Sequence, residues 1–184
     1  MADHGLTGVL LVGGASRRFG LPKALATFDG ETLAERAWRV LGEACDERIA
    51  VGKAADALAL PFPLIDDGTE TRAPIAGVVA GLRAARHEVS VFLPVDCAVV
   101  TAASIRRLGE AVGVSPTGPL PGAYPRSALP VLERRLREGE LALYAAVAEL
   151  GLPAVDLEPA ELRNVNTPAD LDALLAGARR PTAH

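Results

Sequence analysis

The stretch Gly8-Val-Leu-Leu-Val-Gly-Gly-Ala-Ser-Arg-Arg-Phe-Gly-Leu-Pro-Lys23 decides how this chain folds. Its apolar run from Val9 to Val12 predicts a buried strand. The run ends in Gly13 and Gly14, whose backbone amides can approach a ligand closely because glycine has no Cβ. Consecutive amides that point into one concavity bind anions such as phosphates, and neighbouring arginine and lysine side chains add positive charge. The stretch therefore predicts a strand followed by a loop that binds the phosphates of a nucleoside triphosphate.

Two common phosphate loops do not fit this stretch. A Walker loop places lysine directly after its last glycine, whereas Leu21 and Pro22 separate Gly20 from Lys23. The dinucleotide fingerprint Gly-x-Gly-x-x-Gly fails as well, because the glycines fall at positions 13, 14 and 20. The pattern Leu-x-Gly-Gly-x-Ser-x-Arg-x-Gly-x-x-Lys does fit, and it resembles the signature loop of nucleotidyltransferases with a GT-A-like fold. Within that group the chain most resembles the molybdenum cofactor guanylyltransferase family.

This resemblance implies a fold and an activity. The fold is a three-layer α/β/α single domain over residues 1–184, with a mostly parallel, Rossmann-like sheet. The alternation of helical and strand patterns along the chain also favours a parallel sheet. The implied activity is magnesium-dependent transfer of GMP from GTP to molybdopterin, with release of pyrophosphate. Transient contact with proteins that handle the molybdenum cofactor is expected on the same ground.

Composition limits the class of protein. The 184 residues are 49% hydrophobic and 23% charged, which is typical of a globular domain. The formal net charge of -4 argues against a nucleic-acid partner, which would favour a basic surface. The sequence has no signal-peptide pattern and no apolar run near roughly eighteen residues, so we expect a cytoplasmic protein without a membrane partner.

Asp96 is the predicted metal ligand. It follows the near-continuous apolar run 89–95, which indicates a strand buried on both faces. An acid at the carboxyl end of such a strand lies where ligands bind in open α/β sheets, and Mg²⁺ takes oxygen ligands from carboxylates and phosphates. The resembled family coordinates its metal with an aspartate at this position. It usually continues Asp-x-Pro, whereas this chain has Asp96-Cys97-Ala98.

A second acid-ended strand, over 63–66, precedes a helix with closely spaced glycines. In the resembled family the aspartate that matches Asp66 contacts the base, and the glycine that matches Gly77 lies against it. A carboxylate can accept hydrogen bonds from the N1 and N2 edge of guanine. A turn acid at Asp66 or Asp67 remains the alternative. Gly77 and Gly81 predict close approach of a backbone or a ligand to this helix, since helical glycine costs about 1 kcal/mol relative to alanine.

The segment Asn164-Val-Asn-Thr-Pro-Ala-Asp-Leu171 matches a second signature of the resembled family, Asn-x-Asn-Thr-Pro-x-Asp-Leu. Thr167 is a natural N-cap, and Pro168 suits the first helical position. Asn164 and Asn166 alternate, so in an extended segment both side chains leave the same face. We expect both to bind the acceptor substrate.

The predicted site residues fall into overlapping groups. Lys23, Arg18 and Asp96 are the expected catalytic residues, Asp96 is the expected metal ligand, and Asn164 and Asn166 are the expected acceptor-binding residues. Nucleotide binding is assigned to the loop, the base-facing positions and the metal ligand: Leu11, Val12, Gly13, Gly14, Ser16, Lys23, Asp66, Gly77 and Asp96. Arg72 is a candidate phosphate contact.

Only Lys23 and Lys53 among the nineteen basic residues are lysines. The resembled family often has a nucleotide-contacting asparagine where this chain has Gly52-Lys53, so either Lys53 replaces that contact or the contact is absent.

Further elements follow from periodicity and end signals. Thr32 and Glu35 form a predicted capping box at the start of a helix. Helices are also expected over 101–112, 127–138 and 141–150, the second of these ending at Gly139, and strands over 49–52 and, as an edge strand, 153–157. Trp38 is expected to pack against the protein rather than to serve as a ligand platform.

Three alternative functions remain open. One is transfer of a cytidylyl group from CTP to molybdopterin, although the Gly13-Gly14 pair favours guanine because cytidylyl relatives more often have Ala-Gly there. Another is transfer to a different phosphorylated acceptor, such as a phospholactate or a sugar phosphate. The third is a nucleotide-binding regulatory module without turnover.

Overall fold

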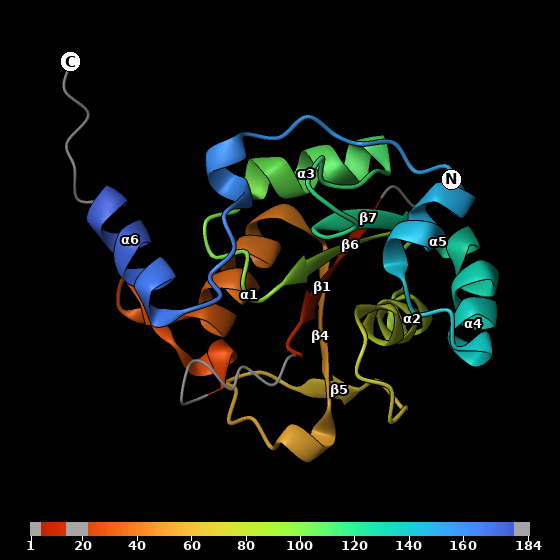
Figure 1. Cartoon of the computed structure of the whole chain (residues 1–184), viewed down its shortest axis with the longest axis horizontal. Helices are drawn as coiled ribbons and strands as arrows, with labels where there is room; N and C mark the ends of the chain where they lie inside the picture. The colour runs from red at the N-terminus through yellow and green to blue at the C-terminus, as the bar shows by residue number, and fades with distance from the viewer. Residues whose placement is uncertain (1–4, 14–21, 179–184) are drawn as a thin grey trace.

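The computed structural model describes residues 5–13 and 22–178. A five-stranded sheet runs through the middle of the molecule, in the order β5-β4-β1-β6-β7 (Figure 1). Its strands are β1 (Leu6–Leu11), β4 (Glu47–Gly52), β5 (Leu64–Asp66), β6 (Val89–Pro94) and β7 (Gly122–Pro125). All neighbouring pairs are parallel except β6 with β7. The mostly parallel α/β fold is therefore confirmed, with one antiparallel strand at the edge.

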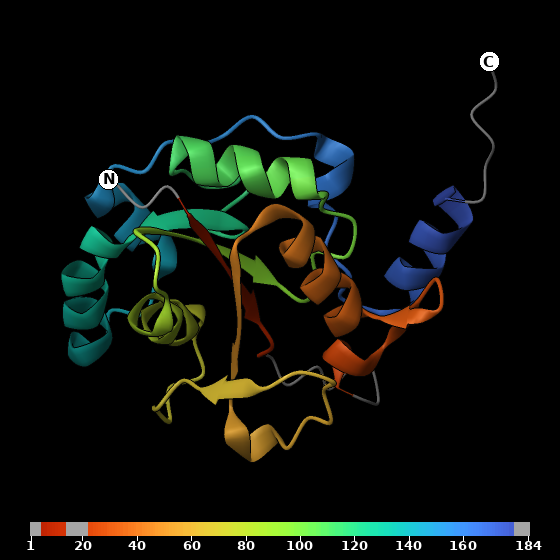
Figure 2. The same ribbon diagram turned by 180° about the vertical axis from the view of Figure 1, so that it is seen from behind.

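Helices cover both faces of this sheet (Figures 1 and 2). One face packs on α1 (Leu33–Ala44) and α3 (Ala102–Ala111), and α6 (Pro168–Ala178) joins that layer through Leu171. The other face packs on α2 (Pro74–Ala84), α4 (Leu129–Glu138) and α5 (Leu143–Leu150). Strand β1 is buried on both faces, because Leu10 belongs to the first core cluster and Val9 and Leu11 to the second. Its apolar run in the sequence thus reflects a position at the centre of the sheet.

Short elements connect the larger ones. A hairpin of β2 (Thr27–Phe28) and β3 (Glu31–Thr32) leads into α1. The 3₁₀ turns are η1 (Lys23–Leu25), η2 (Ala54–Asp56), η3 (Arg126–Ala128) and η4 (Pro159–Leu162). Helix α1 begins with the predicted capping box: the Glu35 backbone N–H donates to Thr32 Oγ1 at 3.1 Å, and the Thr32 backbone N–H donates to Glu35 Oε2 at 2.9 Å. Gly139 ends α4 in the left-handed conformation at φ 75°, as its position predicts.

The expected edge strand over 153–157 is wrong. That segment makes a single parallel bridge, between Ala154 and Val114. Val114 also bridges to Gly122 of β7, so one residue joins the segment to the sheet edge without a full strand. The expected starts of two helices are wrong as well, because α4 begins at Leu129 after η3 and α5 begins at Leu143.

The topology sets where a ligand can bind. From β1 the chain adds β4 and β5 on one side of the sheet centre, and then crosses to add β6 on the other side. The carboxyl ends of β1, β4 and β6 therefore border one crevice. Such a switch in strand order is where open α/β sheets bind ligands.

Candidate functional site at the switch in strand order

A cavity of about 1300 Å³ opens at these strand ends. It is bounded by the ends of β1, β4 and β6, the start of α2 and the segment that leads into α6. Its lining includes twelve residues that sequence reasoning or charge singles out: Leu11, Val12, Gly13, Lys23, Lys53, Asp56, Asp67, Arg72, Gly77, Asp96, Asn164 and Asn166. The cavity is large enough for a nucleotide together with a second substrate.

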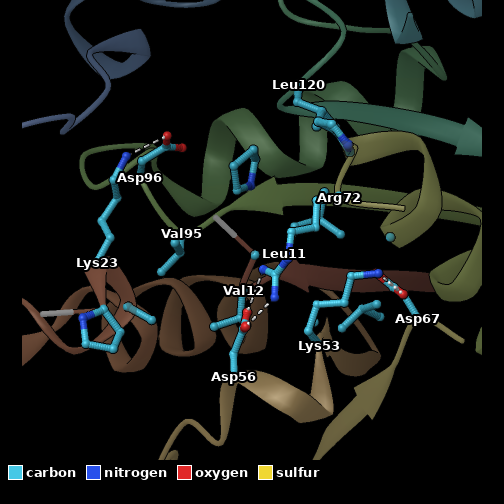
Figure 3. Close-up of a pocket in the computed structure, with 18 of the residues that line it drawn as sticks. Leu11, Val12, Lys23, Lys53, Asp56, Asp67, Arg72, Val95, Asp96 and Leu120 are labelled. Atoms are coloured by element: carbon cyan, nitrogen blue, oxygen red, sulfur yellow. Dashed lines mark hydrogen bonds and ion pairs between the residues drawn. The ribbon is translucent and has the colours of Figure 1, made fainter. Parts of the chain in front are cut away.

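Lys23 and Asp96 meet at one end of the cavity (Figure 3). Lys23 Nζ lies 3.2 Å from Asp96 Oδ2 and donates to Asn166 Oδ1 at 3.1 Å. The Lys23 and Asp96 side chains are 15% and 24% exposed, so their charges are partly shielded from water but remain accessible from the cavity. Three segments that lie far apart in the sequence therefore converge on one charged cluster.

The two predicted asparagines both line the cavity, although neither lies in a strand. The Val165 backbone N–H donates to the Asp96 carbonyl oxygen at 2.9 Å, which ties this segment to the loop after β6. The side chain of Asp170 accepts from the backbone N–H groups of Asn166 at 2.9 Å and Thr167 at 2.7 Å. These bonds, together with the Thr167 hydroxyl, hold the pKa of the Asp170 carboxyl below its usual range. The predicted helix start at Thr167 is confirmed and fixes the asparagine segment in place.

Cys97 lies behind the cluster as a buried thiol. Its Sγ is 3.4 Å from Asn164 Oδ1, and burial, followed by the negative charge of Asp96, raises the pKa of this thiol. A neutral thiol is a weak nucleophile, which agrees with a packing position. Cys97 and Cys45 are both free cysteines.

Two further ion pairs line the cavity, and the pair of Lys53 and Asp67 lies at the end away from Asp96 (Figure 3). Lys53 Nζ pairs with Asp67 Oδ1 at 2.7 Å, and the Arg72 guanidinium pairs with Asp56 Oδ1 at 2.9 Å. All four side chains line the cavity. Asp66, the predicted base contact, is not among the lining residues, whereas the adjacent Asp67 is. Sequence reasoning missed Asp56, whose position in a short 3₁₀ turn has no distinguishing pattern.

The two glycines of α2 are explained by the sheet beneath them. A Cβ on Gly77 would lie 2.8 Å from Leu11 Cδ2, and one on Gly81 would lie 2.6 Å from Phe92 Cε1. Gly77 also lines the cavity. The expected close approach is thus made by side chains of β1 and β6, not by another backbone. It allows α2 to pack close to the sheet.

Trp38 packs as expected, with its ring stacked on Phe62 at a centroid separation of 4.3 Å. Gly14, Ser16 and Arg18 lie outside the described residues, so their predicted roles stay predictions. None of the helices in the described ranges has the length and apolar content needed to cross a membrane.

The oxygen atoms beside Lys23 suit the coordination of a hard cation that a bound substrate also coordinates. Within residues 5–13 and 22–178 no three His, Cys, Asp or Glu side chains gather closely enough to hold a metal ion. Among the described residues the one hydrogen bond to Asp96 Oδ1 comes from Cys97 Sγ, at 3.9 Å. The side chains of Asn164 and Asn166 line the same cavity. One carboxylate with oxygen neighbours fits a cation that substrate phosphates also coordinate.

Comparisons with known proteins agree with this geometry. The family model described as MobA-like NTP transferase domain matches residues 8–152. A molybdenum cofactor guanylyltransferase from Acidiphilium cryptum is 36% identical and covers 94% of this chain and 95% of its own length. One from Desulfosudis oleivorans is 30% identical, with coverage of 91% and 93%. This chain belongs to the MobA-like NTP transferase family.

The match to solved structures shows the same fold for this MobA-like NTP transferase. Molybdopterin-guanine dinucleotide biosynthesis protein A from Archaeoglobus fulgidus superposes with a TM-score of 0.73 at 24% identity. The alignment covers 94% of this chain and 98% of that one. The chain is therefore a nucleotidyltransferase by family, and its cavity lies at the switch in strand order where this class of sheet binds ligands.

Proposed function

We propose that this nucleotidyltransferase transfers GMP from GTP to molybdopterin, forming molybdopterin guanine dinucleotide and pyrophosphate with the help of Mg²⁺. The observation that carries the proposal is the convergence of Lys23, Asp96 and Asn166 at one end of a nucleotide-sized cavity. The names of the full-length relatives supply the substrates. Relatives named molybdenum cofactor guanylyltransferase cover nearly all of this chain, which favours transfer of a guanylyl group over transfer of a cytidylyl group.

In the proposed reaction the acceptor's terminal phosphate attacks the α-phosphorus of GTP, and pyrophosphate leaves. No covalent protein intermediate is needed, because phosphoryl-type transfer depends mainly on positioning and charge stabilisation. Lys23 contacts the phosphates and stabilises the negative charge that develops on the leaving oxygens. Asn164 and Asn166 orient the acceptor through neutral hydrogen bonds. Arg18 and the amides of Gly13 and Gly14 are predicted to hold the leaving pyrophosphate.

Asp96 would hold the cation, with oxygen atoms of Asn164 and Asn166 nearby. When bound, Mg²⁺ would neutralise charge on the phosphates shared with Asp96. The Lys23 ammonium lies against the same carboxylate, so the site holds one fixed positive and one fixed negative charge side by side. We propose that residues 1–184 form one domain. A cytoplasmic location stays a prediction, as does contact with proteins that handle the molybdenum cofactor.

The direct test measures thermal stabilisation by GTP, CTP, UTP and ATP side by side, each with Mg²⁺. A ligand present at one hundred times its dissociation constant stabilises the folded state by about 2.7 kcal/mol. The largest shift is expected with GTP, and pyrophosphate should be released when molybdopterin is added. A larger shift with CTP would reassign the enzyme as a cytidylyltransferase. Absence of a shift with all four nucleotides would overturn the proposal.

A further inference from the structure

The loop that carries Asp96 consists of two consecutive turns. In the first turn the Cys97 backbone N–H donates to the Pro94 carbonyl oxygen at 3.1 Å, and Asp96 is the third of its four residues. In the second turn the Val100 backbone N–H reaches the Cys97 carbonyl oxygen at 3.5 Å, which is long and therefore weak for a hydrogen bond. Asp96 thus lies beside a turn that its own backbone closes only weakly.

Arg36 of helix α1 holds this second turn from outside. Its Nε donates to the Ala98 carbonyl oxygen at 2.6 Å, although the two residues are 62 positions apart in the sequence. Among the described residues no other group donates to that carbonyl. The Arg36 side chain is 25% exposed, and Ala98 is buried. A hydrogen bond from a charged donor is about twice as strong as one between neutral groups, so the guanidinium is a firm anchor for the loop.

The guanidinium is itself held by the hairpin that precedes α1. Its Nη1 donates to Glu31 Oε1 at 3.1 Å, and its Cζ lies 5.0 Å from the centre of the Phe28 ring. Both partners belong to the β2–β3 hairpin, which follows η1, the turn that contains Lys23. Arg36 therefore links the segment after Lys23 to the loop that carries Asp96.

We propose that Arg36 is a positioning residue, which holds the Ala98 carbonyl and thereby keeps the Asp96 carboxylate against Lys23. This inference rests on the proposed nucleotidyl transfer and adds a residue that is not among those lining the cavity. Lys23 and Asp96 meet at 3.2 Å only while their two segments keep this spacing. Displacement of a reacting group by about 1 Å can cost on the order of a hundredfold in rate, so a contact behind the site can control the reaction.

Position 98 allows the same restraint to be supplied by the backbone. Ala98 is the second residue of the turn from Cys97 to Val100, where proline is favoured because its ring fixes φ at about −65°. Its φ is not positive, and within residues 5–13 and 22–178 no group accepts a hydrogen bond from its N–H. Proline would therefore remove no hydrogen bond of the loop. Position 98 is also where this chain departs from the Asp-x-Pro pattern.

The test compares Arg36→Met, Arg39→Met, Ala98→Pro and the double variant Arg36→Met/Ala98→Pro with the wild type. Methionine keeps an apolar stem and lacks the guanidinium. Arg39→Met is the matched control, because Arg39 also lies in α1 and pairs with Glu31 at 2.7 Å, while among the described residues none of its hydrogen bonds reaches the loop. Hydrogen exchange of the amides of residues 95–100 is measured in protein without metal or nucleotide. The kcat for pyrophosphate release and the melting temperature are measured alongside.

In Arg36→Met the loop amides are expected to exchange about tenfold faster than in the wild type, the effect of one charge-assisted hydrogen bond. Its kcat is expected to fall by at least about tenfold. Arg39→Met and Ala98→Pro are expected to keep the exchange and the kcat of the wild type. The double variant is expected to return to within about threefold of the wild type in both, because the two substitutions act on one turn and are not additive.

A purely structural Arg36 would lower the melting temperature and leave loop exchange and kcat as in Arg39→Met, and that result would overturn the inference. A folded double variant with the full loss of kcat would also overturn it. If the double variant does not fold, the comparison of the two methionine variants decides. Exchange is measured without substrate, so it tests Arg36 independently of the nucleotide. A wild type that uses CTP in place of GTP would overturn the proposed function and leave this inference to be decided by exchange and by kcat with CTP.

Discussion

The Nζ atom of Lys23 lies 3.2 Å from Oδ2 of Asp96, although the two residues are 73 positions apart in the sequence. The contact joins η1 to the loop after β6. Val95 reinforces this junction, because its backbone N–H donates to the Leu11 carbonyl oxygen at 3.1 Å. The position of Asp96 beside the end of β1 is thus set by the pairing of the two central strands, and Lys23 reaches it from η1. We expect the two charges to act on the same ligand.

Asp96→Asn should abolish pyrophosphate release while the protein stays folded. The amide keeps the shape of the side chain but loses the charge that would hold a cation, so we expect a loss of activity on the order of a hundredfold or more. The ion pair with Lys23 is partly exposed, so its loss should cost no more than about 1 kcal/mol of folding free energy. Activity is measured by coupled pyrophosphate detection and folding by thermal denaturation, with Asp156→Asn as control. Full activity of Asp96→Asn would exclude the metal assignment.

Lys23→Met should lower kcat on the order of a hundredfold, since it removes positive charge from the position where charge develops. Lys23→Arg restores the charge, but its planar guanidinium cannot reproduce the compact ammonium that contacts both Asp96 and Asn166. We therefore expect Lys23→Arg to recover only part of the activity. Steady-state rates at saturating GTP and acceptor distinguish the three proteins. A Lys23→Met protein with wild-type kcat would remove Lys23 from the reaction.

Sequence patterns predicted the sheet because its central strands are buried on both faces. The near-continuous apolar runs of β1 and β6 reflect that burial. The end of each run also predicts which residues follow the strand at its carboxyl end. This is why Asp96 could be placed in the site from sequence. The antiparallel β7 and the single bridge at Ala154 depend on packing between distant segments, so no local pattern predicted them.

The hydrogen-bond partners of Lys53 could not be predicted from the sequence. Two of its three acceptors are backbone carbonyl oxygens, of Thr69 and Thr71, which any residue type would supply. The pattern of adjacent acids could not distinguish Asp66 from Asp67 either. Their roles depend on which backbone N–H groups reach each carboxylate, and that is decided by the fold of the loop.

Gly81→Ala and Gly42→Ala should change stability in opposite directions. Both glycines lie in helices, where alanine is favoured by about 1 kcal/mol. The new Cβ at position 81 would lie 2.6 Å from Phe92 Cε1 and 2.8 Å from Val9 Cγ1, inside the packed core. Overpacking of this kind costs about 1–3 kcal/mol and should outweigh the helical gain. At position 42 the nearest atom is Nη1 of Arg48, the end of a flexible side chain, at 2.7 Å.

We therefore expect Gly81→Ala to lower the free energy of unfolding by about 1–2 kcal/mol, and Gly42→Ala to raise it by less than about 1 kcal/mol. Urea denaturation of the two variants and the wild type measures both changes. Stabilisation by Gly81→Ala would show that α2 can move away from the sheet at no cost, contrary to the packing described above.

Both cysteines should resist alkylation in the folded protein. Burial raises the pKa of Cys45 to about 12, with a further contribution from the negative charge of Asp46. Burial and the Asp96 carboxylate raise the pKa of Cys97 in the same direction. The thiolate is the reactive form, and a raised pKa keeps the thiol protonated at pH 8, whereas an unperturbed cysteine with a pKa near 8.5 is partly ionised there. Iodoacetamide should thus react with both thiols at least about a hundredfold more slowly in native protein than in urea. Mass spectrometry of labelled peptides follows each residue separately, and labelling of native Cys97 at the unfolded rate would contradict its buried position behind Asp96.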